Sequence, residues 1–236
     1  MTANKNSDLT REQLDELTGF DSPTIANAVE AFNVREQTEG YASLELRCFY
    51  PEYKPVIGYA VTCTEDTASP GRKGNKEDYL NYELLYRAIE ASPKPVILVI
   101  KNIGSDRLRS DHLGDIMATM FHRLGTAALV TDGGIRDVDG IRERAPGFQV
   151  FAAGTVVSHG IPRLVEIGTT VSIFGLTIRP GELLHGDVNG LVSIPASIAG
   201  KLADQAKKVI EIEQRKIQYL RSPGYSLDAW KNEFGF

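Results

Sequence analysis

Residues 115–137 read DIMATMFHRLGTAALVTDGGIRD, and this stretch decides the fold that we expect around it. Between Ser110 and Gly125 the apolar residues recur at helical intervals, and the glycine is a typical helix stop. Residues 127–131 predict a buried strand, and the run 132–134, Asp-Gly-Gly, predicts a turn. The sequence therefore predicts a helix, a strand and a turn in immediate succession.

The lengths of these elements predict which side chains meet. A helix of about fourteen residues advances roughly 21 Å, and a strand of five or six residues returns by roughly 17 to 20 Å. If the two elements pack antiparallel, Arg136 and Asp137 lie beside the first helical turn, which contains Asp115. Two carboxylates and a guanidinium then meet at a helix N-terminus, whose free N–H groups and dipole favour anions.

This grouping has a functional and a structural interpretation. In the functional one, Asp137 binds a hard cation, Arg136 binds a carboxylate or a developing oxyanion, and Asp115 positions or activates a water. In the structural one, Asp137 and Asp139 are helix caps, Arg136 is their solvated partner, and Asp115 is an ordinary first-turn acid. Spacing alone leaves both interpretations open.

Length and composition predict a globular protein that does not bind nucleic acid. The chain has 236 residues, 42% of them apolar, which suffices for one large domain or two small ones. The net charge is −5, and no basic block is present to neutralise phosphates. The nearest approach to one, Arg72, Lys73 and Lys76, is followed directly by Glu77 and Asp78, which is typical of a solvated loop.

The content of cysteine and histidine limits the metal sites that we expect, and the hydropathy of the chain indicates its cellular compartment. Two cysteines, Cys48 and Cys63, are too few for a disulfide framework and lack metal-ligand spacing. The N-terminus is polar, and no run approaches 18 apolar residues, so we expect a soluble, cytoplasmic protein without membrane contact. The four histidines are scattered along the chain, which indicates surface or packing roles: they are His112, His122, His159 and His185. His112 lies close enough in sequence to the proposed site to modulate it.

The order of elements favours one domain over residues 1–236. Thr10 and Gln13 form a capping box for an opening helix, and Ser22-Pro23 begins a second one. Strands and helices then alternate to about residue 155, after which short strands and turns predict a compact barrel or small sheet. Further expected elements are a strand over 55–64, a polar loop over 65–76, a helix over 76–92, an amphipathic helix over about 197–220, and a tail over 221–236.

The run Leu113-Gly114-Asp115, followed after twenty residues by Arg136-Asp137-Val138-Asp139, resembles the signature of the 4-hydroxy-4-methyl-2-oxoglutarate aldolase family. That family also includes the regulator of ribonuclease activity A. The resemblance covers most of residues 15–225. Other similar segments are residues 22–31, 95–100, 103–105, 147–152 and 179–195.

The resemblance implies a fold and a reaction. The fold is an α/β/α sandwich around a central β-barrel, assembled as a homotrimer or homohexamer with sites at the subunit interfaces. The reaction is cleavage of a 4-hydroxy-2-oxo acid to pyruvate and a second oxo compound. It depends on Mg²⁺ or Mn²⁺ and is often accompanied by oxaloacetate decarboxylation.

The resemblance also implies roles for residues. Asp137 and several waters hold the metal, with Glu213, or failing that Glu211, contributed by the C-terminal helix of a neighbouring subunit. Arg136 stabilises the developing enolate oxygen, and Asp115, directly or through a metal-bound water, removes the 4-hydroxyl proton. The start of the helix binds the substrate carboxylate through backbone N–H groups; its residues are Gly114, Asp115, Ile116 and Met117.

One segment departs from the family. Where the family has an acidic residue and consecutive glycines, this chain has Lys101-Asn102-Ile103-Gly104. Lys101 at the end of an apolar strand is where a Schiff-base lysine would lie, so a metal-free aldolase is one alternative and an exposed loop lysine is another. The altered loop is also compatible with a different substrate, such as a sugar-derived oxo acid.

The competing class of function is a non-catalytic regulator that binds another protein. Such a protein has no need of a metal-binding carboxylate. Asp115, Arg136 and Asp137 occur together here, which favours catalysis.

Overall fold

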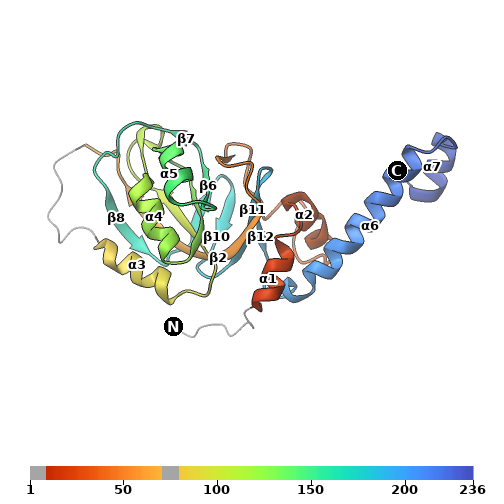
Figure 1. Ribbon diagram of the computed structural model, residues 1–236, viewed down its shortest axis with the longest axis horizontal. Helices are drawn as coiled ribbons and strands as arrows, with labels where there is room; N and C mark the ends of the chain where they lie inside the picture. Colours follow the sequence, from red (N-terminus) through yellow and green to blue (C-terminus); the bar gives the residue numbers. More distant parts are fainter. Residues whose placement is uncertain (1–8, 71–79, 236) are drawn as a thin grey trace.

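A curved, mixed sheet forms the centre of the computed structural model, which describes residues 9–70 and 80–235 (Figure 1). Its strands are β1 (Arg47–Cys48), β2 (Val56–Asp66), β3 (Val96–Asn102), β4 (Thr126–Thr131), β6 (Gln149–Ala152), β8 (Arg163–Ile167), β11 (Leu183–Asp187) and β12 (Gly190–Ile194). The strand order is β1-β6-β4-β3-β2-β11-β12, and β8 also pairs with β2. The beginning of β2 pairs with β11 and its end with β8, so this long strand curves the sheet into a nearly closed barrel. The expected combination of layered helices and a barrel is confirmed.

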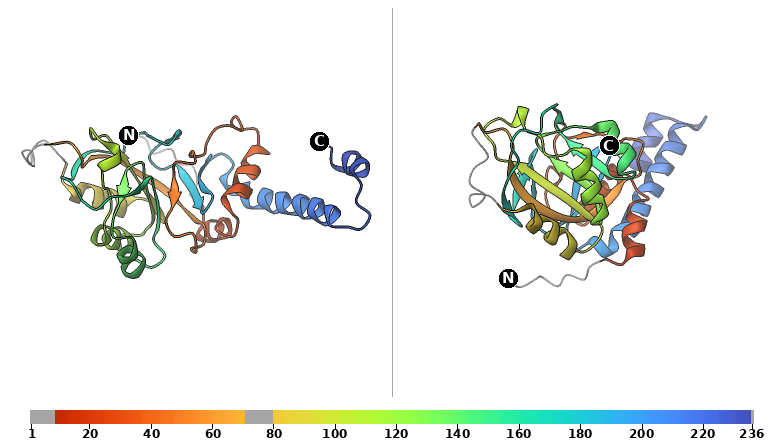
Figure 2. Two further views of the ribbon diagram at one scale, coloured as in Figure 1. Left: turned by 90° about the horizontal axis from the view of Figure 1, so that it is seen from above. Right: turned by 60° about the vertical axis from the view of Figure 1, so that its left-hand side comes forward.

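Helices and hairpins pack around the sheet (Figures 1 and 2). The helices are α1 (Arg11–Leu17), α2 (Ser22–Glu30), α3 (Tyr82–Ala91), α4 (Asp115–Arg123), α5 (Val138–Arg144), α6 (Leu202–Leu220) and α7 (Leu227–Phe234). Two small sheets pair β5 (Gly134–Ile135) with β7 (Gly154–Thr155), and β9 (Val171–Ile173) with β10 (Leu176–Ile178). Single turns of 3-10 helix span Arg107–Arg109 and Ala199–Lys201.

The apolar central strands supply both faces of the sheet because successive side chains point to opposite sides. In β3, Leu98 packs with α3, α4 and α5, whereas Ile97 and Val99 pack with the β9–β10 hairpin. A third cluster joins α1, α2 and the beginning of α6 to β11 and β12, with Ile25 and Leu202 at its centre. The sheet is therefore held from three directions, and the carboxyl ends of its parallel strands remain available to a site.

Several sequence expectations are confirmed. Thr10 caps α1, and its side chain and that of Gln13 form the expected capping box. The strand expected over 55–64 is β2, and the strand after α4 is β4. The turns expected after residue 155 close the β9–β10 and β11–β12 hairpins.

Other expectations were wrong. The helix expected from Ser110 begins only at Asp115, because the residues before it pair with residues 134–136 as extended chain: Gly134 N–H donates to the Ser110 carbonyl at 2.9 Å and Arg136 N–H to the Leu113 carbonyl at 2.9 Å. Glu65 lies within β2 rather than in a loop. The tail expected after residue 220 contains α7.

The helix expected over 76–92 begins at Tyr82 among the described residues. The basic cluster at 72–76 and its acidic neighbours lie outside the described residues. No described helix is long and apolar enough to cross a membrane.

The C-terminal helix α6 leaves the body of the protein as an arm (Figures 1 and 2). Its 19 residues begin in the α1–α2 layer, and its far end carries α7. Aromatic contacts hold the two helices together, because Tyr219 of α6 packs against Trp230 and Phe234 of α7 with ring centroids 6.1 and 5.7 Å apart. The expected boundaries of the helix, about 197–220, are confirmed apart from its first turn, which is a 3-10 helix.

Candidate functional site

The first turn of α4 lies beside the segment that joins β5 to α5, as the element lengths predicted. Asp115 N–H lies 3.5 Å from Asp137 Oδ2, and Arg136 Nη1 lies 3.6 Å from the same oxygen. Gly114, the N-cap of α4, permits this approach: a Cβ added there would lie 2.9 Å from Asp137 Oδ2 and 3.2 Å from Arg136 Nη2. An arginine, a carboxylate and a helix N-terminus therefore converge.

The extended segment before α4 adds a second carboxylate to this group. Asp111 forms a parallel bridge with Gly134, and its N–H donates to Thr67 Oγ1 at 2.9 Å. Its Oδ2 lies 3.4 Å from Arg136 Nε. The carboxylate is buried, and this burial, partly opposed by a Leu113 N–H hydrogen bond and by Arg136, raises the pKa of Asp111 to about 6.

A buried histidine and glutamate form the floor of the same region. His112 Nδ1 lies 2.6 Å from Glu65 Oε2, and both side chains are almost completely buried. His112 is fixed in place because its N–H donates to the Gly134 carbonyl at 3.0 Å. Two polar side chains are thus buried at the end of β2, where an apolar pair would satisfy packing at lower desolvation cost.

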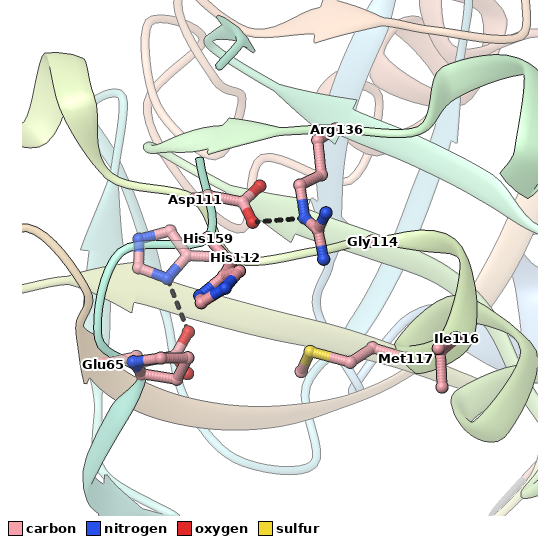
Figure 3. Close-up of a pocket in the computed structure, with 9 residues that line it drawn as sticks. Glu65, Asp111, His112, Gly114, Ile116, Met117, Arg136 and His159 are labelled. Carbon is pink, nitrogen blue, oxygen red and sulfur yellow. Dashed lines mark hydrogen bonds and ion pairs between the residues drawn. The ribbon is translucent and has the colours of Figure 1, made fainter. Parts of the chain in front are cut away.

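These groups surround a cavity of about 50 Å³ (Figure 3). It is lined by Glu65, Asp111, His112, Gly114, Ile116, Met117, Arg136, His159 and Pro162. The carboxyl ends of β2, β3 and β4 meet at this edge of the sheet, the usual place for a ligand in open α/β folds. The cavity combines a cation, acidic groups and an apolar rim.

The structure brings most of the substrate-binding residues expected from the sequence to this cavity. Gly114, Ile116, Met117 and Arg136 line it, and Ile116 is 82% exposed. Asp115 does not line it. Its carboxylate is paired with Arg144 of α5 and accepts the Ile116 N–H at 2.8 Å, so that N–H group is already engaged.

Asp137 has the chemistry of a ligand for a hard cation. Its side chain is partly exposed beside Arg136 and supplies oxygen donors, but it is not among the residues that line the cavity. Among residues 9–70 and 80–235, no three His, Cys, Asp or Glu side chains gather into a metal site. A cation at Asp137 would therefore take most of its ligands from water or a second chain, which suits Mg²⁺ because that ion retains several waters in proteins.

Glu213 and Glu211 lie elsewhere in the single chain. Both are exposed on α6, and Glu213 Oε1 accepts a hydrogen bond of 3.2 Å from Asn27 on α2. Figure 1 shows that α6 projects away from α4 and α5. Within one subunit, neither glutamate reaches Asp137.

Lys101 lies at the end of β3, and its ammonium group is paired with the buried carboxylate of Asp132 at the end of β4. The other Asp132 oxygen accepts the Asn102 N–H at 2.8 Å. Lys101 is not among the residues that line the cavity. The ion pair with Asp132 gives Lys101 a structural role at the ends of β3 and β4.

Sequence reasoning missed Asp111 and Glu65 and gave His112 only a modulating role. Glu65 was assigned to a loop because polar residues follow it, and Asp111 was assigned to the helix. One signal was available in the sequence. Asp111 and His112 directly precede Leu113-Gly114 and do not belong to the apolar stripe of a helix, which indicates a different role for them.

Fold and site together define a mixed α/β protein with a polar, arginine-containing cavity at the carboxyl edge of its parallel strands. The sequence model of the RraA-like family, described as Aldolase/RraA, matches residues 23–193. The chain belongs to this family.

Relatives of the chain carry aldolase names. A Halalkalibacterium halodurans protein, provisionally named a 4-hydroxy-4-methyl-2-oxoglutarate aldolase, is 33% identical over 129 residues, which are 54% of this chain and 59% of that protein. An Azotobacter vinelandii protein with the same provisional name is 36% identical over 109 residues, 45% of this chain and 64% of that protein. The chain thus spans less than two thirds of the length of either relative.

A solved structure shows the same fold. Streptomyces coelicolor RraAS2, described as an unusual member of the RNase ES inhibitor RraA protein family, matches with a TM-score of 0.67 and 23% identity over 89% of this chain and 98% of that one. The family therefore includes both proteins named as aldolases and proteins named as ribonuclease inhibitors.

Proposed function

We propose that this chain is a divalent-metal-dependent aldolase that cleaves a 4-hydroxy-2-oxo acid to pyruvate and a second oxo compound, with oxaloacetate decarboxylation as a side activity. The observation that carries the proposal is that Arg136 and the N-terminus of α4 line one cavity, with the Asp137 carboxylate directly beside both of them. The aldolase names of the relatives support the same class of reaction.

Asp137 would hold Mg²⁺ or Mn²⁺ together with water molecules. When bound, the metal supplies Lewis-acid polarisation of the 2-oxo acid group. The donor set supports this choice, since Asp137 offers carboxylate oxygens and the described residues contain no cluster of three His, Cys, Asp or Glu side chains that would favour a softer ion.

Arg136 and the helix start bind the substrate. The Arg136 guanidinium is held from one side by Asp111 and from the other by Asp137, so its orientation is fixed before substrate arrives. It stabilises the C2 oxygen as negative charge develops during C–C cleavage. The N–H groups at the start of α4 would bind the substrate carboxylate, and that of Met117, a cavity-lining residue, would contribute most because the Ile116 N–H is engaged by Asp115.

Asp115 is proposed to remove the 4-hydroxyl proton. Because its carboxylate is paired with Arg144, this proton reaches it through a water rather than directly. The assignment separates the two reactions of the enzyme, since oxaloacetate has no 4-hydroxyl proton to remove.

The test is an assay of pyruvate release from a panel of 4-hydroxy-2-oxo acids and oxaloacetate. EDTA should abolish release, and Mg²⁺ or Mn²⁺ should restore it. Full activity after exhaustive chelation, with borohydride trapping at Lys101, would replace this mechanism with imine chemistry. Release from no member of the panel would place the chain with non-catalytic, protein-binding members of the family.

We further propose that the active particle is a homotrimer or homohexamer. A glutamate on the α6 arm, Glu213 before Glu211, would reach the metal waters of a neighbouring subunit, because no glutamate of α6 reaches the site of its own chain. Light scattering should give a trimer or a multiple of it. An active monomer would remove Glu213 from the site.

A further inference from the structure

We infer that Asp111 is a catalytic acid of this site and delivers the proton that converts the enolate of pyruvate into pyruvate. The inference rests on the proposed function and assigns a step that the proposed function leaves open. Retro-aldol cleavage needs one group to remove the 4-hydroxyl proton and a second proton donor for the carbon left behind.

The geometry of Asp111 suits this step. Its backbone is fixed by the Thr67 hydrogen bond and by the bridge to Gly134, so its side chain is held at the cavity wall. One carboxylate oxygen faces Arg136 Nε at 3.4 Å, and the other, Oδ1, is buried and has no hydrogen-bond partner among residues 9–70 and 80–235. In Figure 3 the Asp111 side chain lies against Arg136, the residue proposed to bind the C2 oxygen next to the reacting carbon.

An unpartnered buried carboxylate oxygen is costly to folding, and such a group is typical of a functional site. Burial raises the pKa of Asp111 to about 6, so both protonation states are available near neutral pH. The charged or titratable groups that face it are Arg136 on the β5–α5 segment, His112 on its own segment and Glu65 at the end of β2. Arg136 and His112 favour the carboxylate and Glu65 opposes it, but desolvation has the largest effect.

Other acids and bases near the cavity are committed to partners. His112 Nδ1 is held by Glu65, the Asp115 carboxylate by Arg144, and Lys101 by Asp132. His159 is the remaining alternative, since it lines the cavity. It is exposed, however, and its Nδ1 contacts the Gly160 carbonyl at 2.8 Å.

The step balances without any further reactant. Cleavage of the C3–C4 bond leaves its electron pair in the enolate of pyruvate. The Asp111 O–H bond then breaks and a C–H bond forms at C3, using the enolate electron pair, while the C2 oxygen returns to a keto group. Asp115 releases the 4-hydroxyl proton to water and Asp111 takes up one proton from water, so the two transfers cancel over the whole reaction.

The reverse of this step can be measured alone, because pyruvate bound at the site should exchange its methyl protons with solvent. The probe is pyruvate in D₂O with saturating Mg²⁺, and the readout is loss of the methyl signal in ¹H NMR. Asp111→Asn should slow exchange by about 10² to 10⁴-fold. Asp139→Asn, which removes an exposed carboxylate paired only with Arg142, should leave the exchange rate unchanged.

The wild-type pH profile tests the inference without a variant. Exchange needs the Asp111 carboxylate to accept a methyl proton, so the rate should be full above about pH 6 and fall as the pH drops through 6. Thermal unfolding of Asp111→Asn should confirm that the variant is folded.

The outcomes separate the two proposals. If the wild type releases pyruvate from no 4-hydroxy-2-oxo acid, the proposed function fails. If it releases pyruvate but folded Asp111→Asn exchanges at the wild-type rate, or the wild-type profile is flat between pH 5 and 7, the role of Asp111 is overturned alone. Loss of exchange in His159→Gln but not in Asp111→Asn would also overturn it and assign the proton to the histidine.

Discussion

Replacement of Gly114 by alanine should impair the site far more than the fold. The backbone at Gly114 has φ −118° and ψ 176°, an extended conformation that alanine adopts without strain. The added Cβ would lie 2.9 Å from Asp137 Oδ2, so the carboxylate must move by several tenths of an ångström. Because an error of about 1 Å in the position of a catalytic group costs about 10²-fold, we expect kcat/KM for pyruvate release to fall by about 10-fold or more.

Stability should change little in this variant. The displaced atom is the end of the Asp137 side chain, which can move. Alanine also lowers the conformational entropy of the unfolded chain, which stabilises the folded state by about 0.4–1 kcal/mol. We expect the free energy of unfolding, measured with denaturant, to change by less than about 1 kcal/mol.

Gly154→Ala is the matched control, because a Cβ there meets no atom within 4 Å and the variant should keep wild-type activity. Wild-type kcat/KM in Gly114→Ala, or equal losses in both variants, would refute the placement of the site at the start of α4.

Three further predictions concern charged residues. Arg136→Lys keeps a cation but loses the planar fork, so turnover should fall by about 10² to 10³-fold while Mg²⁺ affinity, measured by titration, changes little. Asp115→Asn should abolish aldol cleavage and affect oxaloacetate decarboxylation much less; equal loss of both would show that Asp115 organises water instead, and no loss would show an ordinary first-turn acid. Asp111→Asn should change how stability depends on pH. The folded pKa of Asp111, about 6, is raised above the usual value of 3.8 for an aspartate, so the contribution of this group to stability is fully present below about pH 4 and lost as pH rises through 6. Denaturant unfolding should therefore show the wild type losing at most about 3 kcal/mol relative to the variant between pH 4 and 6, and parallel curves would contradict the raised pKa.

The sequence predicted the architecture around the cavity because strong local signals agreed with one another. Apolar periodicity located α4 and β4, and their antiparallel packing places Arg136 and Asp137 beside the first turn of α4 as expected, although α4 has 9 residues rather than about fourteen. The capping residues of α1 predicted its start for the same reason: Thr10 and Gln13 act on neighbouring backbone groups.

The errors occurred where distant segments determine the local conformation. Leu113 continues the apolar periodicity of α4, but residues 110–113 pair with residues 134–136, and that pairing takes up their backbone hydrogen bonds. The same pairing turns Asp111 toward Arg136 and His112 toward Glu65, contacts between residues 25 and 47 positions apart in the chain. No local pattern encodes them.

The part of the site that we assign to a second subunit can be read neither from the sequence nor from the structure of one chain. Glu213 is exposed on α6 in the single chain, so its role remains a prediction.

The backbone conformation of Asp137 is energetically unfavourable for a residue other than glycine. With φ 57° and ψ 38° it lies in the left-handed region, and its side chain does not cap α5 although it occupies the N-cap position. Glycine would adopt this conformation without steric penalty. Asp137→Gly would therefore relieve strain while deleting the one carboxylate best placed for a cation. Any selection of this protein for thermal resistance alone would tend to remove Asp137, so stabilised variants should be screened for catalysis from the first round.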